Sequence, residues 1–467
     1  MFCTRLVVSL TTLKVGGAST KKIKTSFHFA FHSLSRIFAK EDKCVMKYKL
    51  KAPKNIAADI MLPASKSISN RALIVQALTP GCPLPDNLSD CDDTTAMLDA
   101  LNGNDNDNDN ANVDIGAAGT AMRFLTAYYA VTEGEHWLTG TERMRQRPIG
   151  LLVDALRHLG AEIAYDGAEG FPPLHIKGKK IDGGYIEMPG NISSQYVSAL
   201  LMIGPTLKKG LTLRLTGDIV SKPYIDLTLG VMGNYGAEAA WTDVDTLSVV
   251  PHGYKPAPFF IESDWSAASY WYEAMALSGD AGSEVRLQGL SDGSRQGDAV
   301  VRYIFSTLGV RTVFNPSSDK KDSAITLSLH DRLMPRIDID FTSSPDLAQT
   351  LVATCIGLEI PFHFTGLESL RIKETDRTRA LQNECGKLGF VLEAAGNGEL
   401  SWNGTRKEVT STIIDTYDDH RMAMAMAPLC HKFEGLTINH PEVVSKSYPH
   451  FWDDMKKAGY EIEELND

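Results

Sequence analysis

One combination of elements recurs along the chain: a stretch with helical spacing of apolar residues, a glycine, and then apolar and polar residues in alternation. The segments are ALRHLGAEIAY, GVMGNYGAEAAW, IFSTLGVRTVF, NECGKLGFVLEA and DMKKAGYEIEE, with glycines Gly160, Gly236, Gly309, Gly389 and Gly459. MLDALNG, which ends at Gly103, fits as a sixth copy. Glycine suits the left-handed backbone that ends a helix, and alternation is typical of a strand. The sequence therefore predicts six helix–glycine–strand units.

A second helix in each unit is predicted from segments that are apolar on nearly every side. QYVSALLMIGPTL, DLAQTLVATCIGL and HRMAMAMAPLC are the clearest of them. These helices should begin near Ser67, Thr120, Ser194, Ser266, Asp346 and His420. Ser, Thr and Asp are good N-caps, and a helix that is apolar all round belongs in a protein interior. We expect an α/β (α+β) fold of two domains, each with three repeats and with its helices inside its sheets.

Composition restricts the class of ligand. The 467 residues include 47 Lys and Arg and 58 Asp and Glu, for a formal net charge of −11. An acidic chain is a poor partner for nucleic acid, so any anionic ligand must be held by locally clustered cations. We found no apolar stretch of about 20 residues, which argues against a membrane span. Seven scattered cysteines without a CxxC pair indicate a reducing compartment, with neither a disulfide framework nor a metal site.

Two segments are not used to predict the fold. Residues 1–40 hold seven Lys or Arg, ten Ser or Thr and no acidic residue, a composition similar to an organelle targeting segment. We favour the alternative that 1–45 is a mis-called start, because Met46 opens a natural-looking N-terminus, MKYKLKAPKNI. The tract NGNDNDNDNAN at 102–112 is predicted to be a solvated loop expansion.

Basic residues recur at the predicted starts of the glycine-terminated helices. Each precedes its glycine by 12 to 14 positions, and they are Arg147, Lys222, Arg295, Arg377 and Lys446. A cation beside the positive end of a helix dipole is unfavourable by about 0.3–1 kcal/mol. Five such cases predict helix starts that converge on bound anions, where backbone N–H groups and cations act together. The alternative is that duplication copied an exposed, solvated residue.

Three motifs at the predicted starts of the buried helices carry groups that can donate hydrogen bonds to an anion: hydroxyl, amide and cationic side chains, or the backbone of a glycine-rich turn. PASKSISNRALIV holds Lys66, Ser67 and Arg71, and GNISSQYVSALL holds Ser193, Ser194 and Gln195. DIGAAGTAMRF has a glycine-rich turn, Gly116 to Gly119, that matches neither a P-loop nor a dinucleotide fingerprint. Taken alone, the Lys66 motif is better explained as an N-cap with ordinary surface charges, and the glycine-rich turn as a turn that binds no ligand. For Ser193 to Gln195, a phosphate site and routine capping explain the motif equally well.

The acidic candidates lie in the second half of the chain. Asp346, in TSSPDLAQTLV, could act as a general base. It could also be an ordinary acid at a helix N-terminus, where the helix dipole stabilises a carboxylate. LRIKETDRTRA is predicted to be helical, with Lys373 and Arg377 on one face and Glu374 facing elsewhere, and a solvated charged face is the usual explanation for such a run. TYDDHRMAMAMA places Asp418, Asp419, His420 and Arg421 beside a buried helix, which predicts charges that face a cleft between domains.

Taken together, the motifs resemble those of the 5-enolpyruvylshikimate-3-phosphate synthases, a family of enolpyruvyl transferases. The motifs occur in the order PASKSISNRAL, GAAGTAMR, RMRQRPIG, SSQ, SKPYID, RIKETDR and TYDDHRMAM, and the resemblance runs from Met46 to the C-terminus. It implies a two-domain inside-out α/β barrel with three βαβαββ repeats in each domain and a double crossover. The implied domains are 46–64 plus 264–467, with 65–263 inserted between them.

The resemblance also implies an activity: transfer of the enolpyruvyl group of phosphoenolpyruvate to the 5-hydroxyl of shikimate 3-phosphate, with release of phosphate. The implied enzyme is a cytoplasmic monomer of aromatic amino acid biosynthesis that needs no cofactor. Implied contacts to shikimate 3-phosphate are Lys66, Ser67, Arg71, Ser193, Ser194, Ser221, Asp346 and Lys373. Implied contacts to phosphoenolpyruvate are Lys66, Gly119, Arg147, Gln195, Arg377, Arg421 and Lys446. The implied catalytic residues are Asp346 as base, Glu374 as acid to the methylene carbon, and Lys66.

Three positions depart from the family pattern, and two other functions stay open. Ala117 stands where Asn is common, Phe124 where Pro is common and Ser369 where Asn is usual, which leaves substrate affinity and glyphosate sensitivity open. A sister enzyme that uses UDP-N-acetylglucosamine needs a cysteine on a mobile loop, and neither Cys82 nor Cys91 lies in such a segment. A repeat protein that binds phosphorylated ligands without turnover is the second alternative.

Overall fold

The computed structural model describes residues 46–103, 111–317, 320–332, 334–396 and 398–466. The segment 1–45 and most of the asparagine–aspartate tract lie outside the described residues, so the predictions for both remain predictions. The described chain builds two hydrophobic cores. One core runs from Ala64 to Ile261, and the other combines Leu50 to Leu62 with Trp265 to Tyr460. We call the parts around them the N-lobe and the C-lobe.

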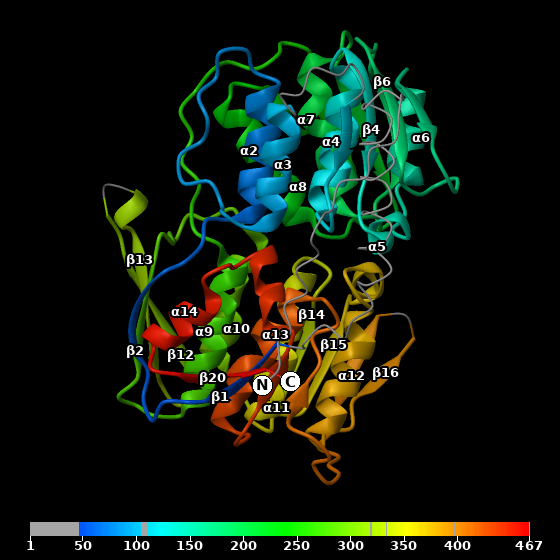
Figure 1. Cartoon of the computed structure of the whole chain (residues 1–467). Coiled ribbons are helices and arrows are strands. Elements are labelled where there is room, and N and C mark those ends of the chain that lie inside the picture. Colours follow the sequence, from blue (N-terminus) through cyan, green and yellow to red (C-terminus); the bar gives the residue numbers. More distant parts are fainter. Residues whose placement is uncertain (1–45, 104–110, 318–319, 333, 397, 467) are drawn as a thin grey trace, which may run out of the picture. The chain divides into compact units, whose positions relative to one another are not determined.

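The N-lobe places helices at its centre and sheets outside them (Figure 1). Its interior helices are α2 (Lys66–Ala77), α4 (Gly119–Val131) and α7 (Ser194–Ile203), accompanied by α3 (Asp92–Asn102), α5 (Glu142–Arg145), α6 (Gly150–His158), η1 (Gly204–Thr206) and α8 (Lys222–Asn234). One sheet has the order β3 (Ala111–Asp114), β4 (Gly134–Thr139), β6 (Leu174–Gly178), β5 (Glu162–Tyr165). The other has the order β7 (Gly184–Pro189), β8 (Leu211–Thr216), β10 (Thr246–Val249), β9 (Ala239–Trp241).

The C-lobe repeats this plan with three sheets. Its interior helices are α9 (Trp265–Ser278), α11 (Ala348–Gly357) and α13 (His420–Met426), with α10 (Val301–Thr307), α12 (Arg377–Lys387) and α14 (Phe451–Lys457) beside them. Short 3-10 helices are η2 (Gly297–Val300), η3 (Lys320–Asp322), η4 (Pro345–Leu347), η5 (Glu368–Ile372), η6 (Ala427–His431) and η7 (Pro441–Lys446). The first sheet is β12 (Val310–Asn315), β13 (Ala324–Leu329), β11 (Glu284–Gln288), β2 (Ala57–Met61). The second is β14 (Ile337–Asp340), β15 (Phe362–Thr365), β17 (Glu399–Trp402), β16 (Glu393–Ala395), and the third is β18 (Ile413–Ile414), β19 (Thr437–Asn439), β1 (Met46–Lys51), β20 (Glu461–Asn466).

The six predicted helix–glycine–strand units are confirmed. Each of the six glycines follows a helix and has φ between 72° and 107°, a backbone that a Cβ would strain. A strand comes next in every case: β3, β5, β9, β12, β16 and β20. The second helix series is confirmed as well, because α4 buries all its residues except Tyr128 and Val131, and α9 all except Ser266 and Ser278. The α/β fold with interior helices is therefore correct.

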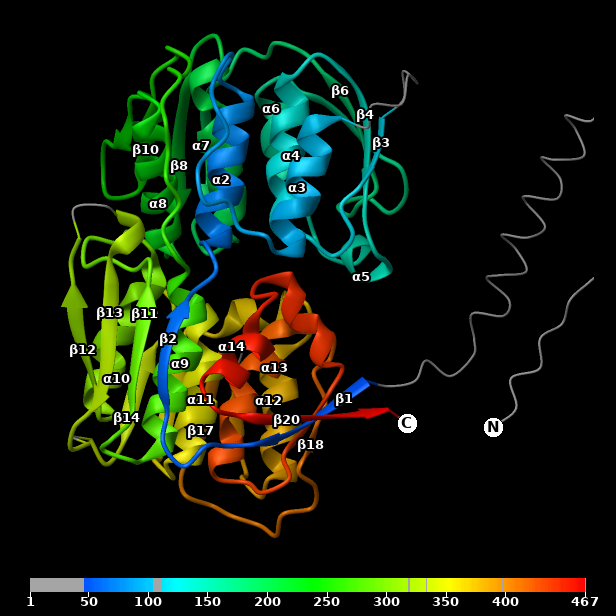
Figure 2. The ribbon, with the colours of Figure 1, turned by 60° about the vertical axis from the view of Figure 1, so that its left-hand side comes forward.

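The two chain segments that connect the lobes lie side by side and are hydrogen-bonded to each other. Strand β2 runs parallel to β11 in the C-lobe, and Ala64, just beyond it, forms an antiparallel bridge with Ser263 on the return. The Ser65 N–H also donates to the Glu262 carbonyl at 2.8 Å. In Figure 2 the blue N-terminal strand β2 rises beside β11 toward α2. The two connections are thus held side by side, directly before helices α2 and α9.

Candidate active site

A cavity of about 880 Å³ lies between the two lobes, and the interior helices begin there. Residues at the start of every interior helix line it: Lys66, Gly119, Ser194, Ser266, Asp346 and His420. The positive end of each helix dipole and its unpaired N–H groups are thus directed at one space. Such an arrangement favours ligands that carry phosphate or carboxylate groups.

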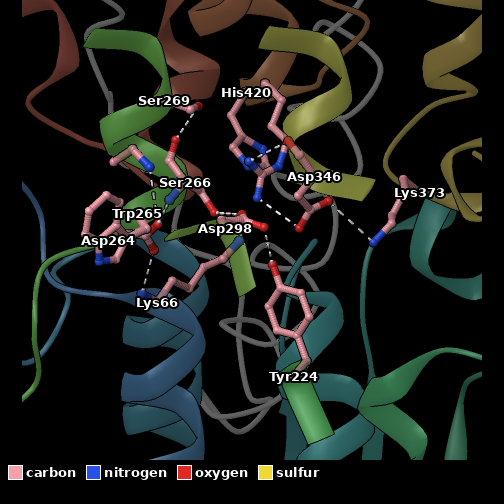
Figure 3. A network of polar contacts seen from close by, with 12 residues as sticks. Lys66, Tyr224, Asp264, Trp265, Ser266, Ser269, Asp298, Asp346, Lys373 and His420 are labelled. Atoms are coloured by element: carbon pink, nitrogen blue, oxygen red, sulfur yellow. Dashed lines mark hydrogen bonds and ion pairs between the residues drawn. The ribbon is translucent and has the colours of Figure 1, made fainter. Parts of the chain in front are cut away.

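Asp346 is surrounded by three cations at the C-lobe wall of this cavity. Its carboxylate lies 3.0 Å from Arg421 Nη2, 3.1 Å from Arg377 Nη1 and 3.6 Å from Lys373 Nζ, a contact visible in Figure 3. Burial alone would raise the pKa of Asp346, but the three positive charges outweigh it and hold the pKa below its usual range. The carboxylate is therefore ionised and able to accept a proton.

Glu374 is a second acid in a cage of cations. Its Oε2 lies 2.9 Å from Arg377 Nη2, and its Oε1 lies 3.0 Å from Lys446 Nζ and 4.0 Å from Arg147 Nη1. Burial works to raise its pKa, but these neighbours hold the pKa well below its usual range. The prediction that Glu374 faces away was wrong, because residues 373–376 are irregular backbone between η5 and α12 and not part of a helix.

Arg377 connects these acids to the protein interior. It is 1% exposed, and its Nε donates to Asp419 Oδ2 at 2.7 Å. Asp419 is fully buried and also caps α13 by accepting from the Arg421 N–H at 2.9 Å. The prediction that TYDDHR faces a cleft is confirmed for His420 and Arg421, which line the cavity, whereas Asp418 is exposed. Helices α12 and α13 are thereby fixed around one ion-pair network.

The N-lobe wall carries buried guanidinium groups with neutral partners. Arg71 donates to Thr228 Oγ1 at 2.7 Å, to Ser198 Oγ at 3.1 Å and to the Ser67 carbonyl at 2.8 Å. Arg123 donates to the carbonyls of Gly119 and Pro148. Within the described part of the chain no carboxylate pairs with either residue, and burial lowers the pKa of both to about 10. A buried cation without a counterion is costly, so this wall is complementary to an anionic ligand.

Lys66 links the first interior helix to the C-lobe. Its Nζ lies 3.3 Å from Asp93 Oδ2, and its backbone N–H donates to Asp264 Oδ2 at 3.2 Å. Burial acts to lower the pKa of Lys66, but Asp93, Cys91 and Glu374 together outweigh it and raise the pKa. The ammonium group is therefore maintained at the cavity wall.

Almost all the predicted site residues meet in this cavity. Its lining includes Lys66, Ser67, Arg71, Gly119, Arg147, Ser193, Ser194, Gln195, Ser221, Asp346, Lys373, Glu374, Arg377 and Arg421. Lys446 lies outside the lining, and its ammonium contacts Glu374 and donates to the Ala117 carbonyl at 3.0 Å. Of the positions that depart from the family pattern, Ser369 lines the cavity and Phe124 is buried 5.3 Å beneath the Arg71 guanidinium.

Three of the five helix-start cations lie outside the cavity lining. Lys446 still contacts Glu374 of the lining, but the predicted convergence was wrong for Lys222 and Arg295. Lys222 Nζ lies 4.5 Å from the centre of the Trp241 ring, where a cation–π contact holds it. Arg295 packs against α8 at Gly230, where the missing side chain leaves room for its guanidinium. Both side chains are thus used in packing at the side of α8.

Several polar residues of the site were missed by the motif analysis. Figure 3 shows Asp298 between the lobes: its Oδ1 accepts from Tyr224 of α8 at 3.1 Å and its Oδ2 accepts from Ser266 of α9. Asp264 caps α9 through the Ser266 N–H at 2.7 Å. Burial, followed by the nearby Asp346, raises the pKa of Asp298 to about 6. The SKPYID and SDWS segments carried a signal for Tyr224 and Asp264, but none linked Asp298 to them.

Two negative findings concern the described residues alone. No helix there is long and apolar enough to cross a membrane. No cluster of three or more His, Cys, Asp or Glu side chains has the arrangement of a metal site in the same ranges. Cys82 and Cys91 are free thiols buried in the N-lobe and away from the cavity lining.

Three comparisons with known proteins agree with one another. The family model described as EPSP synthase (3-phosphoshikimate 1-carboxyvinyltransferase) matches residues 50–104 and 102–455. A protein of Bacteroides fragilis named 3-phosphoshikimate 1-carboxyvinyltransferase is 54% identical over 419 residues, which cover 89% of this chain and 99% of the relative. A protein of Shewanella pealeana with the same name is 35% identical over 436 residues, covering 88% and 99%.

Solved structures show the same fold. An EPSP synthase from Acinetobacter baumannii has a TM-score of 0.70 and 20% identity, covering 90% of this chain and all of that one. The enolpyruvyl transferase NikO from Streptomyces tendae has a TM-score of 0.68 and 15% identity, covering 91% of this chain and all of that one. At these identities the likeness concerns the fold alone.

Proposed function

Because this chain belongs to the EPSP synthase family, we propose that its cavity performs the reaction after which the family is named. The enzyme transfers the enolpyruvyl group of phosphoenolpyruvate to the 5-hydroxyl of shikimate 3-phosphate and releases phosphate. The observation that carries this proposal is the pair of acids, Asp346 and Glu374, that share Arg377 at a cavity. The opposite wall holds Arg71 and Arg123, and no carboxylate of the described residues pairs with either of them. The C-lobe wall thus provides two carboxylates that can transfer protons, and both walls provide cations.

The phosphoenolpyruvate subsite is proposed at the cation cage around Glu374. It comprises Lys66, Gly119, Arg147, Gln195, Arg377, Arg421 and Lys446. A Cβ at Gly119 would lie only 2.6 Å from Arg147 Nη1, so glycine leaves the space in which this guanidinium sits. Gln195 is oriented by its donation to Thr120 Oγ1 at 3.0 Å. These contacts support a compact site for one phosphate and one carboxylate.

The shikimate 3-phosphate subsite is proposed along the N-lobe wall. It comprises Lys66, Ser67, Arg71, Ser193, Ser194, Ser221, Asp346 and Lys373, with the phosphate on Ser193 and Ser194. Ser193 caps α7 by accepting from the Gln195 N–H at 3.4 Å, so the hydroxyl pair and the helix N-terminus face the cavity together. This arrangement supports phosphate binding by neutral donors and a helix dipole.

The proton transfers follow from the electrostatics of the two acids. Asp346 accepts the proton of the 5-hydroxyl as that oxygen bonds to the central carbon of phosphoenolpyruvate, and Glu374 donates a proton to the methylene carbon. The tetrahedral intermediate then collapses: the Glu374 carboxylate takes a proton back from the methyl group, the double bond re-forms, the C–O bond to phosphate breaks, and the proton held by Asp346 leaves with the phosphate. The bound anions compete for Arg377, Arg421 and Lys446, which releases the two acids from the charges that depress their pKa values. The protonated state that Glu374 needs as an acid therefore becomes accessible when both substrates are bound, whereas Asp346 is already ionised without them.

Phosphate release from the purified protein tests this function. Phosphoenolpyruvate plus shikimate 3-phosphate should release phosphate, whereas either substrate alone, or UDP-N-acetylglucosamine as acceptor, should not. Release with UDP-N-acetylglucosamine would identify the sister activity instead. Binding of both substrates without release would identify a binding protein.

The remaining expectations form part of the same proposal. We propose domain boundaries at 46–64 plus 264–467 and at 65–263, which are supported by the two separate cores and by the paired crossing at Ala64 and Ser263. We also propose a cytoplasmic monomer that works without a cofactor and whose lobes close on the first substrate. Sedimentation of the purified protein with and without shikimate 3-phosphate tests its oligomeric state and its compaction.

A further inference from the structure

An exposed arginine of the N-lobe reaches the backbone of the C-lobe segment that carries Glu374. Arg143 lies on the short helix α5, at the edge of the N-lobe that faces the C-lobe (Figures 1 and 2). Its Nε donates to the Glu374 carbonyl at 3.2 Å and its Nη2 donates to the Lys373 carbonyl at 3.1 Å. One planar guanidinium therefore holds two consecutive carbonyl groups of the other lobe.

Helix α5 is a firm base for this contact. Thr141 caps it by accepting from the Met144 N–H at 3.3 Å, and the Met144 side chain is 1% exposed in the N-lobe core. The same turn directs Arg147 into the cavity. The backbone that carries Arg143 is thus anchored on both sides.

The segment that it holds has no regular structure of its own. Residues 373–376 lie between η5 and α12, so helical hydrogen bonds do not fix them. Lys373 Nζ nonetheless lies 3.6 Å from Asp346, and Glu374 contacts both Arg377 and Lys446. A displacement of about 1 Å at this backbone would move both side chains out of reactive geometry.

We propose that Arg143 is a positioning residue, which joins closure of the two lobes to the placement of Lys373 and Glu374. Its contacts exist only while α5 lies against the C-lobe, so the acid segment is held in place when the cavity is closed. Arg143 is absent from the cavity lining and acts through the backbone of residues that touch it. The inference rests on the role proposed above for Glu374.

The chain offers a matched control on the same helix. Arg145 is also exposed and has the same charge, but its Nε donates to the Gly140 carbonyl at 3.2 Å within its own lobe. Arg143→Ala and Arg145→Ala therefore remove the same charge from the same turn. Only the first removes the contact with residues 373 and 374. Arg143→Lys keeps the charge and loses the paired geometry.

Steady-state kinetics give the first readout. We expect Arg143→Ala to lower kcat about tenfold, because two hydrogen bonds to the acid segment are lost. The KM for shikimate 3-phosphate should rise less than kcat falls, since Lys373 is the one residue of its subsite whose backbone Arg143 holds. The kcat of Arg143→Lys should lie between those of the wild type and Arg143→Ala, and the kcat of Arg145→Ala should match that of the wild type. Equal kcat in Arg143→Ala and Arg145→Ala would overturn the proposal.

Amide hydrogen exchange gives a readout that does not depend on the role of Glu374. With saturating shikimate 3-phosphate and phosphoenolpyruvate, the peptide covering 372–378 should become protected in the wild type and in Arg145→Ala but not in Arg143→Ala. Unchanged protection in Arg143→Ala would also overturn the proposal. If Glu374→Gln keeps full turnover, the acid assignment fails, and exchange still decides whether Arg143 holds the segment.

Discussion

Asp346 and Glu374 are joined through one guanidinium: Arg377 Nη1 lies 3.1 Å from Asp346 Oδ1, and Arg377 Nη2 lies 2.9 Å from Glu374 Oε2. The third nitrogen, Nε, is occupied by Asp419. A proton gained by either acid therefore changes the field at the other. The two proton transfers proposed for these acids are therefore expected to be coupled through a single buried side chain.

Arg377→Lys should separate this coupling from simple charge. A lysine keeps the positive charge but cannot donate in the fork that reaches three carboxylates. We expect turnover to fall at least about 100-fold, and the free energy of unfolding to fall by about 3 kcal/mol because Asp419 loses its buried partner. Phosphate release and urea unfolding measure the two effects. Wild-type turnover in this variant would show that the fork is not needed.

Asp346→Ala and Glu374→Gln should each lose turnover while they retain substrate binding. Removal of a general base or acid costs about 10²–10⁴ in rate, whereas the other contacts of shikimate 3-phosphate remain. Calorimetric titration of shikimate 3-phosphate should give a Kd within a few-fold of the wild type for Glu374→Gln. A fully active double variant would sink the proposed roles of both acids.

Gly119→Ala should weaken phosphoenolpyruvate selectively. The new Cβ lies 2.6 Å from Arg147 Nη1, so the guanidinium must move away from Glu374. The KM for phosphoenolpyruvate is expected to rise about tenfold, with little change in that for shikimate 3-phosphate. Gly233→Ala in α8 is the control, since nothing lies within 4 Å of its Cβ position. Equal KM values for the two variants would refute the steric argument.

Asp298 should make stability depend on pH. Its pKa is raised from 3.8 to about 6 in the folded protein, so the folded state binds the proton more tightly than the unfolded chain. Its stabilising contribution is thus full below about pH 4 and is lost as pH rises through 6, a change of about 3 kcal/mol. Urea unfolding should show that, between pH 4 and 7, the free energy of unfolding of the wild type falls relative to that of Asp298→Asn. A constant difference across that range would contradict the assignment.

Local rules explain what the sequence predicted well. The residue that ends each helix adopts a positive φ, which glycine tolerates without strain and other residues rarely adopt. Gly160 and its equivalents therefore mark six units without knowledge of the fold. The apolar helices were equally readable, because only burial accounts for segments such as α11. Both signals lie within about a dozen consecutive residues.

The errors concern residues whose role depends on distant contacts. Glu374 was assigned to the wrong face because charge spacing suggested a helix, whereas its segment is not helical and its carboxylate pairs with Arg147 and Lys446. Asp298 was missed because its partner Tyr224 lies 74 residues away and on the other lobe. Lys222 occupies the predicted position, but a tryptophan of the neighbouring strand β9 binds it instead.

The six interior helices that begin at the cavity have a consequence for kinetics. A chain with a net charge of −11 repels small anions at a distance, but these helix termini and the adjacent guanidinium groups create a local region of positive potential. Substrate capture should therefore slow as ionic strength rises. The same field does not distinguish a phosphate ester from free phosphate, so we expect the released phosphate to compete with the next phosphoenolpyruvate and to inhibit turnover.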